Sequence, residues 1–377
     1  MQTGPRPAPM PSITVIGAGV VGSTIAWELA SAGASVRLID ARTPGDGATR
    51  ASAGVLAPYI EGGSRSALRE LGHESLDLYD AFIARLRAES HREVSYHRNG
   101  TLEVALTQAE AEHLSAASGT LWSEGVEARW VPASVIPDLE PGVSPGAQGW
   151  LFIPSHGFVG VSSLTAAAVA AAEQYAAQVH EETGAIQVSS VAGGGVSVRT
   201  ASSAWDSDVV ILAAGSWSSR ITVAGADPVP VTPIRGQLLQ LLGPRGLLQR
   251  VVWGAAGYLV PWPDGTVLVG ATVEDVGFDE NVTQEARHHL MDMAVTLVPG
   301  LKEAGIADMR AGLRPRGPDE LPLIGHSQVV PGLIYATGHY RNGVLLAPLT
   351  AQIVRRLVFE PGYAPIAALA PERCGRL

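Results

Sequence analysis

The stretch SITVIGAGVVGSTIAWELASAGASVRLID, residues 12–40, decides the fold. The β-branched run at 13–16 predicts a strand, and apolar residues that recur every four positions after it predict one face of a helix. A second apolar run at 36–39 ends at Asp40 and predicts a second strand. A strand, a helix and a strand in this order are typical of a doubly wound α/β sheet.

Three glycines between the first strand and the helix form the motif G-x-G-x-x-G. The first allows a tight turn, the second lets the backbone approach a pyrophosphate, and the third lets the helix pack close to the strand. The helix N-terminus then points at phosphates, and a carboxylate at the end of the second strand can accept hydrogen bonds from a ribose. The residues that this motif assigns to a dinucleotide are Gly17, Gly19, Val20, Val21, Gly22 and Asp40. The alternative is a flavodoxin-like turn without a ligand.

Composition narrows the class of protein. The 377 residues suggest two domains, which can be interleaved, and the net charge of −10 argues against nucleic acid or an anionic membrane as the main partner. No apolar run is long enough to span a bilayer, and residues 1–12 lack the apolar core of a signal peptide. The single cysteine, Cys374, can form no internal disulfide, and the scattered histidines predict no metal site. We therefore expect a cytoplasmic protein.

Segments beyond residue 40 bear on which dinucleotide is bound. The small residues of 45–58 suit backbone that lies against a large planar ligand, and a plain mobile loop is the alternative. The run 166–177 predicts a helix, 185–200 predicts two strands around a glycine turn, and 208–218 predicts a strand ending in Ala-Ala-Gly. A helix, a hairpin and a returning strand favour FAD over a nicotinamide cofactor.

Five motifs resemble, in order, those of the D-amino acid oxidase superfamily of FAD-dependent amine oxidoreductases, and most closely those of the glycine oxidases. They are GAGVVG, GATRASAGVLAP, GYLVPWPDGTVLVGATVEDVGFD, GLRPRGPDELPLIG and GHYRNGVLLAP. The likeness runs from about residue 12 to about residue 360, and the last two motifs are the most specific. Glycine oxidases are flavoenzymes that supply the glycine imine for thiazole synthesis in thiamine biosynthesis, so the resemblance implies that pathway.

The resemblance implies a fold of the α/β and α+β classes. FAD would lie in a doubly wound, Rossmann-like domain of the glutathione-reductase type, and an antiparallel sheet would form a substrate domain. The expected FAD-binding domain comprises residues 1–85, 156–225 and 313–377, and the substrate domain comprises residues 86–155 and 226–312. Alternating β-rich runs between residues 235 and 273 agree with this division.

The resemblance also assigns residues to the cofactor, which we expect to be bound non-covalently. Outside the first glycine motif these are Ala41, Ala48, Thr49, Ala53, Gly54, Val55, Ala185, Gly215, His339, Tyr340, Arg341, Asn342, Gly343, Val344 and Leu345. A helix from about residue 344 to residue 357 would direct its positive N-terminus at the pyrimidine edge of the flavin. The alternative for this last motif is a surface turn that caps the final helix.

Substrate binding is assigned to two arginines and a tyrosine. Arg314 matches the arginine that grips the substrate carboxylate in the family, Arg341 matches a second arginine, and Tyr258 matches a tyrosine that donates to the same carboxylate. These residues imply oxidative deamination of glycine or a small amino acid, with hydride transfer to flavin N5. The products would be an imine, then an oxo acid and ammonia, and hydrogen peroxide if oxygen is the electron acceptor.

Several alternatives stay open. A D-amino acid, sarcosine or another N-methylamino acid is an alternative substrate, a dehydrogenase is an alternative to an oxidase, and a non-catalytic flavoprotein is the second class. A homo-oligomer, such as a tetramer, is expected from the resemblance. Ala256 and Trp262 depart from the family pattern and are expected to alter the roof of the pocket. Cys374 lies in the C-terminal tail, away from the position used for covalent FAD, and Lys302 is a poor candidate for activating oxygen.

Overall fold

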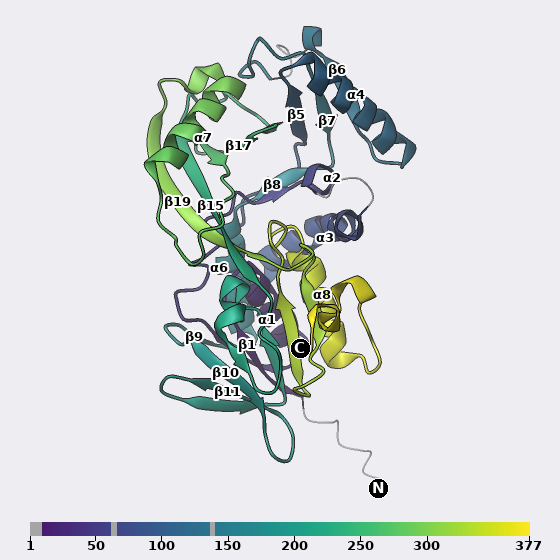
Figure 1. The fold of residues 1–377 in the computed structure, drawn as a ribbon, viewed down its shortest axis with the longest axis vertical. Coiled ribbons are helices and arrows are strands. Elements are labelled where there is room, and N and C mark those ends of the chain that lie inside the picture. Colours follow the sequence, from purple (N-terminus) through teal and green to yellow (C-terminus); the bar gives the residue numbers. More distant parts are fainter. Residues whose placement is uncertain (1–9, 62–65, 136–139) are drawn as a thin grey trace.

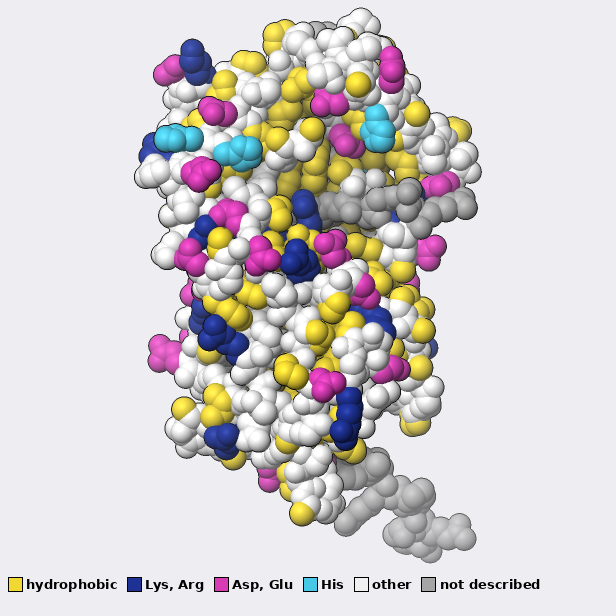
Figure 2. All heavy atoms as spheres, in the orientation of Figure 1, with side chains coloured by type: hydrophobic (Ala, Val, Ile, Leu, Met, Phe, Trp, Pro, Cys, Tyr) yellow, Lys and Arg dark blue, Asp and Glu magenta, His cyan; other side chains and the backbone are white. Residues whose placement is uncertain are grey.

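The computed structural model describes residues 10–61, 66–135 and 140–377; the expectation for the first residues of the chain therefore falls mostly outside the described part. Figure 1 shows two lobes, one around α1, β1 and α8 and the other around β5, β7, β17 and α7. Among the described residues, no helix has the length and apolar character needed to cross a membrane. In Figure 2, basic and acidic side chains are interspersed over the visible face.

Six strands of the described chain form the sheet of the first lobe, in the order β20-β21-β13-β1-β2-β9. Their bounds are β1 Ser12–Ile16, β2 Ser35–Ile39, β9 Gln178–His180, β13 Val209–Leu212, β20 Leu323–His326 and β21 Leu333–Thr337. All neighbouring strands run parallel except β20, which is antiparallel to β21. Since the parallel strands run in the same direction, their carboxyl ends lie at one edge of the sheet. Ligands of doubly wound sheets bind at this edge.

Helices cover one face of this sheet and a smaller sheet covers the other. The helices are α1 Val20–Ser31, α3 Ala67–Ser90, α6 Val161–Gln174 and α8 Ala347–Phe359, and they pack on one another. Trp27 and Tyr79 are fully buried in this helical layer. The smaller sheet has the order β12-β11-β10-β14, with β10 Ala185–Ser190, β11 Val196–Thr200, β12 Ala204–Ser207 and β14 Thr222–Val223. Its Val188 and Val198 pack against β13 residue Val210.

The second lobe is built on a large sheet in the order β19-β15-β18-β17-β16-β5-β7-β6. Its bounds are β5 Thr101–Ala105, β6 Arg129–Pro132, β7 Gly149–Ile153, β15 Thr232–Leu242, β16 Val251–Gly254, β17 Gly257–Pro261, β18 Thr266–Gly270 and β19 Gly305–Arg316. Neighbouring strands are antiparallel except β5 and β16. Helix α7, Gln284–Leu297, packs Leu290 and Leu297 against this sheet, and α4, Gln108–Ser123, packs on β5, β6 and β7.

Short elements complete the chain. The strands β3 Val55–Leu56, β4 Tyr96–His97 and β8 Gly157–Val159 form a small sheet in the order β3-β8-β4. The short helices are α2 Pro58–Glu61, η1 Ala133–Val135, η2 Gly215–Arg220, η3 Pro299–Leu301, η4 Ala367–Leu369 and η5 Pro371–Cys374.

Two expected helices have different bounds in the structure. The alanine-rich helix begins at Val161 and ends at Gln174, earlier than the range 166–177, because the chain leaves the helix before the left-handed Ala176. The final helix begins at Ala347 rather than near residue 344, and a proline lies in its first turn. Proline is favoured there because the backbone N–H groups of the first turn have no partner within the helix. The expected domain boundaries at residues 85 and 312 lie inside α3 and β19, so both elements continue across them. The domain division itself stays a prediction.

Candidate functional site

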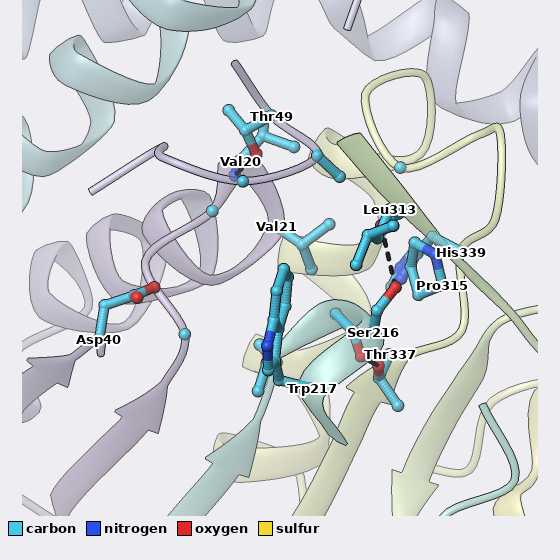
Figure 3. A pocket seen from close by; sticks show the side chains of 18 of the residues that line it. Val20, Val21, Asp40, Thr49, Ser216, Trp217, Leu313, Pro315, Thr337 and His339 are labelled. Carbon is cyan, nitrogen blue, oxygen red and sulfur yellow. Dashed lines mark hydrogen bonds between the residues drawn. The ribbon is translucent and has the colours of Figure 1, made fainter. Parts of the chain in front are cut away.

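A pocket lies at the carboxyl edge of the six-stranded sheet, and residues of the large sheet line it too; Figure 3 shows side chains that line it. The loops after β1, β2, β13 and β21 line one side of it. Tyr258 of β17, and Leu313 and Arg314 of β19, line the other side. The pocket therefore joins the sheet that was expected to hold a dinucleotide to the sheet that was expected to hold a substrate.

The first glycine motif forms a close contact between β1 and α1. Gly17 has φ +103°, and a Cβ there would lie 2.4 Å from the carbonyl oxygen of Ala213. A Cβ on Gly22 would lie only 1.8 Å from the Gly17 carbonyl oxygen. Gly17 lines the pocket. Gly22 is not among the lining residues, and its missing side chain lets the helix approach the strand. The N-cap residue of α1, Gly19, makes no side-chain capping hydrogen bond, so bare backbone faces the pocket there.

The loop of small residues after β2 folds over this helix N-terminus. The Val20 N–H donates to Thr49 Oγ1 at 3.0 Å, and the Gly45 N–H donates to the Ala18 carbonyl at 2.9 Å. Thr49 is buried and lines the pocket (Figure 3). The expected contact of this loop with the pocket is therefore present, and a hydroxyl from the loop supplies the cap that Gly19 lacks.

Asp40 lies at the end of β2, where the sequence predicted a carboxylate. Its Oδ2 accepts the Ala18 N–H at 2.6 Å, and its Oδ1 accepts the Arg42 N–H at 2.9 Å. Burial raises the pKa of Asp40, and the two backbone hydrogen bonds oppose that rise. Each oxygen keeps a further lone pair that can accept a bond from a ligand hydroxyl.

The segment after β13 contributes side chains that sequence reasoning missed. Ser216 Oγ donates to the Leu313 carbonyl at 2.9 Å, which ties η2 to β19 (Figure 3). Thr337 Oγ1 donates to the Gly215 carbonyl at 3.1 Å. Trp217 lines the pocket, and the Arg42 guanidinium lies 4.3 Å from the centre of its ring. An aromatic residue two positions after Ala-Ala-Gly was the available signal for Trp217.

The turn before α8 is held by side chains from α3 and α8. Tyr79 OH donates to the Val344 carbonyl at 2.5 Å, and Ser75 Oγ donates to the Leu345 carbonyl at 2.6 Å. His339 is buried, and its Nε2 lies 3.0 Å from Thr350 Oγ1. Burial lowers the pKa of His339 to about 4, so the ring is neutral near pH 7.

Arg314 is fixed by backbone carbonyls of β15 and of the segment after β18. Its Nη1 donates to the Thr272 carbonyl at 2.9 Å and lies 3.4 Å from the Arg235 carbonyl. Tyr258 is buried, and its ring centre lies 4.8 Å from that of Trp253 on the neighbouring strand. Arg341 is exposed to solvent at the same end of the pocket. The two arginines and the tyrosine that the resemblance selected thus line one pocket.

Most of the expected cofactor residues line the pocket as well. These are Gly17, Gly19, Val20, Val21, Asp40, Ala41, Ala48, Thr49, Ala53, Ala185, Gly215, His339, Tyr340, Arg341, Gly343 and Val344. Five others are not among the lining residues: Gly22, Gly54, Val55, Asn342 and Leu345. A Cβ on Gly54 would lie 1.9 Å from the Val159 carbonyl oxygen, so this glycine serves packing behind the pocket wall.

The two departures from the family pattern also lie away from the pocket lining. Ala256 is exposed in the turn between β16 and β17. Trp262 packs edge-on against Phe158, with ring centres 5.2 Å apart, and neither residue is among those that line the pocket. Cys374 ends η5 and packs beside the core of the smaller sheet, outside the pocket lining.

Comparisons with known proteins agree with this geometry. Residues 12–357 match the family model of the FAD dependent oxidoreductases, DAO. The chain is 32% identical to a glycine oxidase of Geobacillus kaustophilus over 92% of both chains. The crystal structure of glycine oxidase from that organism superimposes with a TM-score of 0.91 at 29% identity, covering 97% of this chain and 99% of that one.

A longer relative shares the same region. The bifunctional protein ThiO/ThiG of Nostoc sp. is 33% identical over 94% of this chain, and this chain spans 53% of its length. The family model and the glycine oxidase match both extend over most of the sequence. The chain therefore belongs to the DAO family of FAD-dependent oxidoreductases, with FAD as its cofactor.

Proposed function

We propose that this protein oxidises glycine, or a similarly small amino acid, to its imine. Water then releases the oxo acid and ammonia, and oxygen takes up the electrons to give hydrogen peroxide. The observation that carries the proposal is Arg314, which lines the pocket together with Tyr258 and the turn before α8. A guanidinium binds a carboxylate with two parallel hydrogen bonds, which fix orientation as well as charge.

The cofactor would extend along the pocket from Asp40 to Arg314. Asp40 would accept hydrogen bonds from the ribose, and the bare backbone at Gly19 would face the pyrophosphate. The turn of residues 339–345 would lie beside the flavin. The absence of a Cβ at Gly19 supports this fit, because a Cβ there would lie 3.1 Å from Thr49 Oγ1 and would crowd the helix N-terminus.

The residues of this chain would bind and orient the substrate rather than move protons. FAD, when bound, supplies the chemistry by accepting a hydride from the α-carbon. Arg314 and Tyr258 would hold the carboxylate and so present the α-carbon to the cofactor. His339 is neutral and hydrogen-bonded to Thr350, so it holds the turn rather than acting as a base. The amine itself must be unprotonated, because its lone pair forms the imine.

A role in making the thiazole of thiamine extends the proposal. It rests on the likeness to the bifunctional ThiO/ThiG proteins, of which this chain spans about half the length. The imine released by glycine oxidation would be the product used in that role. A homo-oligomer and a cytoplasmic location also belong to the proposal.

The decisive experiment is the visible spectrum of the purified protein without oxygen, before and after glycine is added. Bleaching of the flavin band at about 450 nm is expected. A yellow protein that stays oxidised with glycine would contradict glycine as the substrate, and sarcosine, D-alanine and D-proline would be tested next. The Arg314→Lys variant should bleach only at much higher glycine concentrations, because an ammonium cannot form the bidentate contact.

A further inference from the structure

Two glycines that pair across β15 and β19 form a glycine surface next to Arg314, a part of the sheet face without side chains. Gly236 of β15 pairs with Gly312 of β19, and Ile234 pairs with Arg314. Paired residues of antiparallel strands point to the same face of a sheet, and so do residues two apart on one strand. Gly236, Gly312 and Arg314 therefore share one face, the one that meets the pocket.

The Arg314 guanidinium lies directly on Gly236. A Cβ on Gly236 would lie 2.1 Å from Nη2, 2.2 Å from Cζ and 2.2 Å from Nη1 of Arg314. These three atoms are the nearest neighbours of that position, and all belong to the guanidinium. The space that a side chain would fill is thus taken by the group proposed to bind the substrate carboxylate.

Gly312, the other half of this glycine surface, lies against the loop after β2. A Cβ there would lie 2.7 Å from Ala51 Cβ and 3.0 Å from Ala48 Cα, both in the loop that folds over the α1 N-terminus. The guanidinium and this loop therefore rest side by side on the paired glycines. A bulkier residue at either position would move one of them relative to the other.

A hydrogen-bonded segment after β18 sets the direction of the guanidinium. Thr272 offers its carbonyl to Arg314 Nη1, and its Oγ1 accepts the Gln237 N–H at 2.9 Å. Glu274, two residues after Thr272, exchanges backbone hydrogen bonds of 2.9 and 3.0 Å with Arg235. The Arg235 side chain, which is 6% exposed, also pairs with the Glu274 carboxylate. The carbonyl that holds Arg314 is thus anchored to the strand that carries Gly236.

We propose that Gly236 is a positioning residue for substrate binding: it leaves room for the Arg314 guanidinium to lie flat against β15, where the Thr272 carbonyl fixes its direction. This inference rests on the proposed function, in which Arg314 binds the carboxylate. It predicts that a single methyl group at Gly236 displaces the guanidinium and weakens carboxylate binding, while the cofactor stays bound.

The test compares four holoenzyme variants with the wild type: Gly236→Ala, Arg314→Lys, the double variant, and Gly305→Ala as the matched control. Gly305 lies on the same strand pair, and a Cβ there would meet only Leu242 Cδ1, at an ordinary 3.7 Å. Affinity for acetate, a carboxylate without an amine, is measured from the change in the flavin spectrum. Glycine KM, kcat and Tm are measured alongside.

Gly236→Ala should raise the acetate Kd and the glycine KM about 10- to 100-fold, the range expected for lost hydrogen bonds to a charged group. The kcat at saturating glycine should change much less, and Gly305→Ala should behave as the wild type. In the Arg314→Lys background the extra methyl should have little further effect on Kd or Tm, because the guanidinium that it displaces is gone.

Each other outcome has a clear meaning. If Arg314→Lys weakens acetate binding and Gly236→Ala does not, the positioning role is overturned and the proposed function stands. If the wild type binds neither acetate nor glycine, both are overturned. If Gly236→Ala fails to fold, recovery of folding in the double variant supports the conflict with Arg314, and failure of both variants overturns it.

Discussion

Arg42 and Glu280 form a bidentate ion pair that connects the loop after β2 with the segment after β18. Arg42 Nη1 lies 3.1 Å from Glu280 Oε1, and Nη2 lies 2.6 Å from Oε2. The hydrogen bonds that Arg42 donates to the Glu280 carboxylate raise the pKa of Arg42. Phe278 of the same segment packs beside Trp217, with ring centres 5.9 Å apart. The segment that holds Arg314 through Thr272 therefore also contacts Trp217 and Arg42, which line the pocket.

Glu280→Gln should speed the release of FAD. The neutral amide keeps the shape but loses the charge, and a pair of this exposure contributes about 0.5 to 1 kcal/mol, so the dissociation rate should rise roughly 2- to 5-fold. The measurement is the recovery of flavin fluorescence after dilution. Glu303→Gln, at an exposed site, is the control, and equal release rates for the two variants would contradict the role of the pair.

Asp40→Asn should weaken FAD binding more strongly. The amide has one accepting oxygen, so either the Ala18 N–H or the Arg42 N–H loses its partner, which costs about 1 to 3 kcal/mol. Titration of the apoprotein with FAD should give a Kd raised roughly 5- to 150-fold. Asp206→Asn, at an exposed position on β12, should bind FAD as the wild type does. An unchanged Kd for Asp40→Asn would remove this residue from the proposed cofactor site.

Local patterns predicted the first lobe well, because its strands and glycines obey short-range rules. Gly22 is required by its close approach to the carbonyl oxygen of Gly17 in the same motif, so the spacing of these glycines reports the geometry directly. The hairpin of β10 and β11 was predicted for the same reason, since glycine turns are local. Fold class, family and cofactor followed from these elements and from the later motifs, and the comparisons confirm them.

Contacts between distant segments could not be predicted in this way. Nothing near Gly236 in the sequence reveals that the guanidinium of Arg314 lies on it, because the contact depends on the pairing of β15 with β19. Ala256 was expected near the pocket from its place beside Tyr258 in the sequence. Ala256 lies two residues before Tyr258, but it is in the exposed turn between β16 and β17, outside the strand whose alternation would place the two side chains on one face.

The rate of glycine oxidation should rise from about pH 7 to about pH 9, since the substrate must lose a proton from its amine. The pKa of His339 is lowered to about 4, so this residue does not titrate in that range. The rise in kcat/KM should persist in Tyr258→Phe, because the proton that is lost belongs to the substrate. A flat or falling profile in the wild type would exclude the proposed mechanism.

Acid should destabilise the protein partly through His156. This residue is fully buried, with Nδ1 2.8 Å from Thr101 Oγ1, and burial lowers its pKa to about 3. The unfolded chain, with a histidine pKa of about 6.5, binds more protons than the folded chain between these two values. The contribution of His156 to stability is therefore complete above about pH 6.5 and is lost as the pH falls toward about 3, by at most about 1.4 kcal/mol per pH unit.

The variant His156→Asn tests this linkage, because the asparagine amide can still reach Thr101 and carries no titratable group. At pH 7 it should be less stable than the wild type, since the stacking of His156 on Tyr59 is lost. Its free energy of unfolding in urea should fall less steeply between about pH 6.5 and about pH 4.5. His288→Asn, at an exposed site on α7, should keep the steep wild-type dependence. Parallel curves for His156→Asn and the wild type would show that His156 does not bind a proton on unfolding.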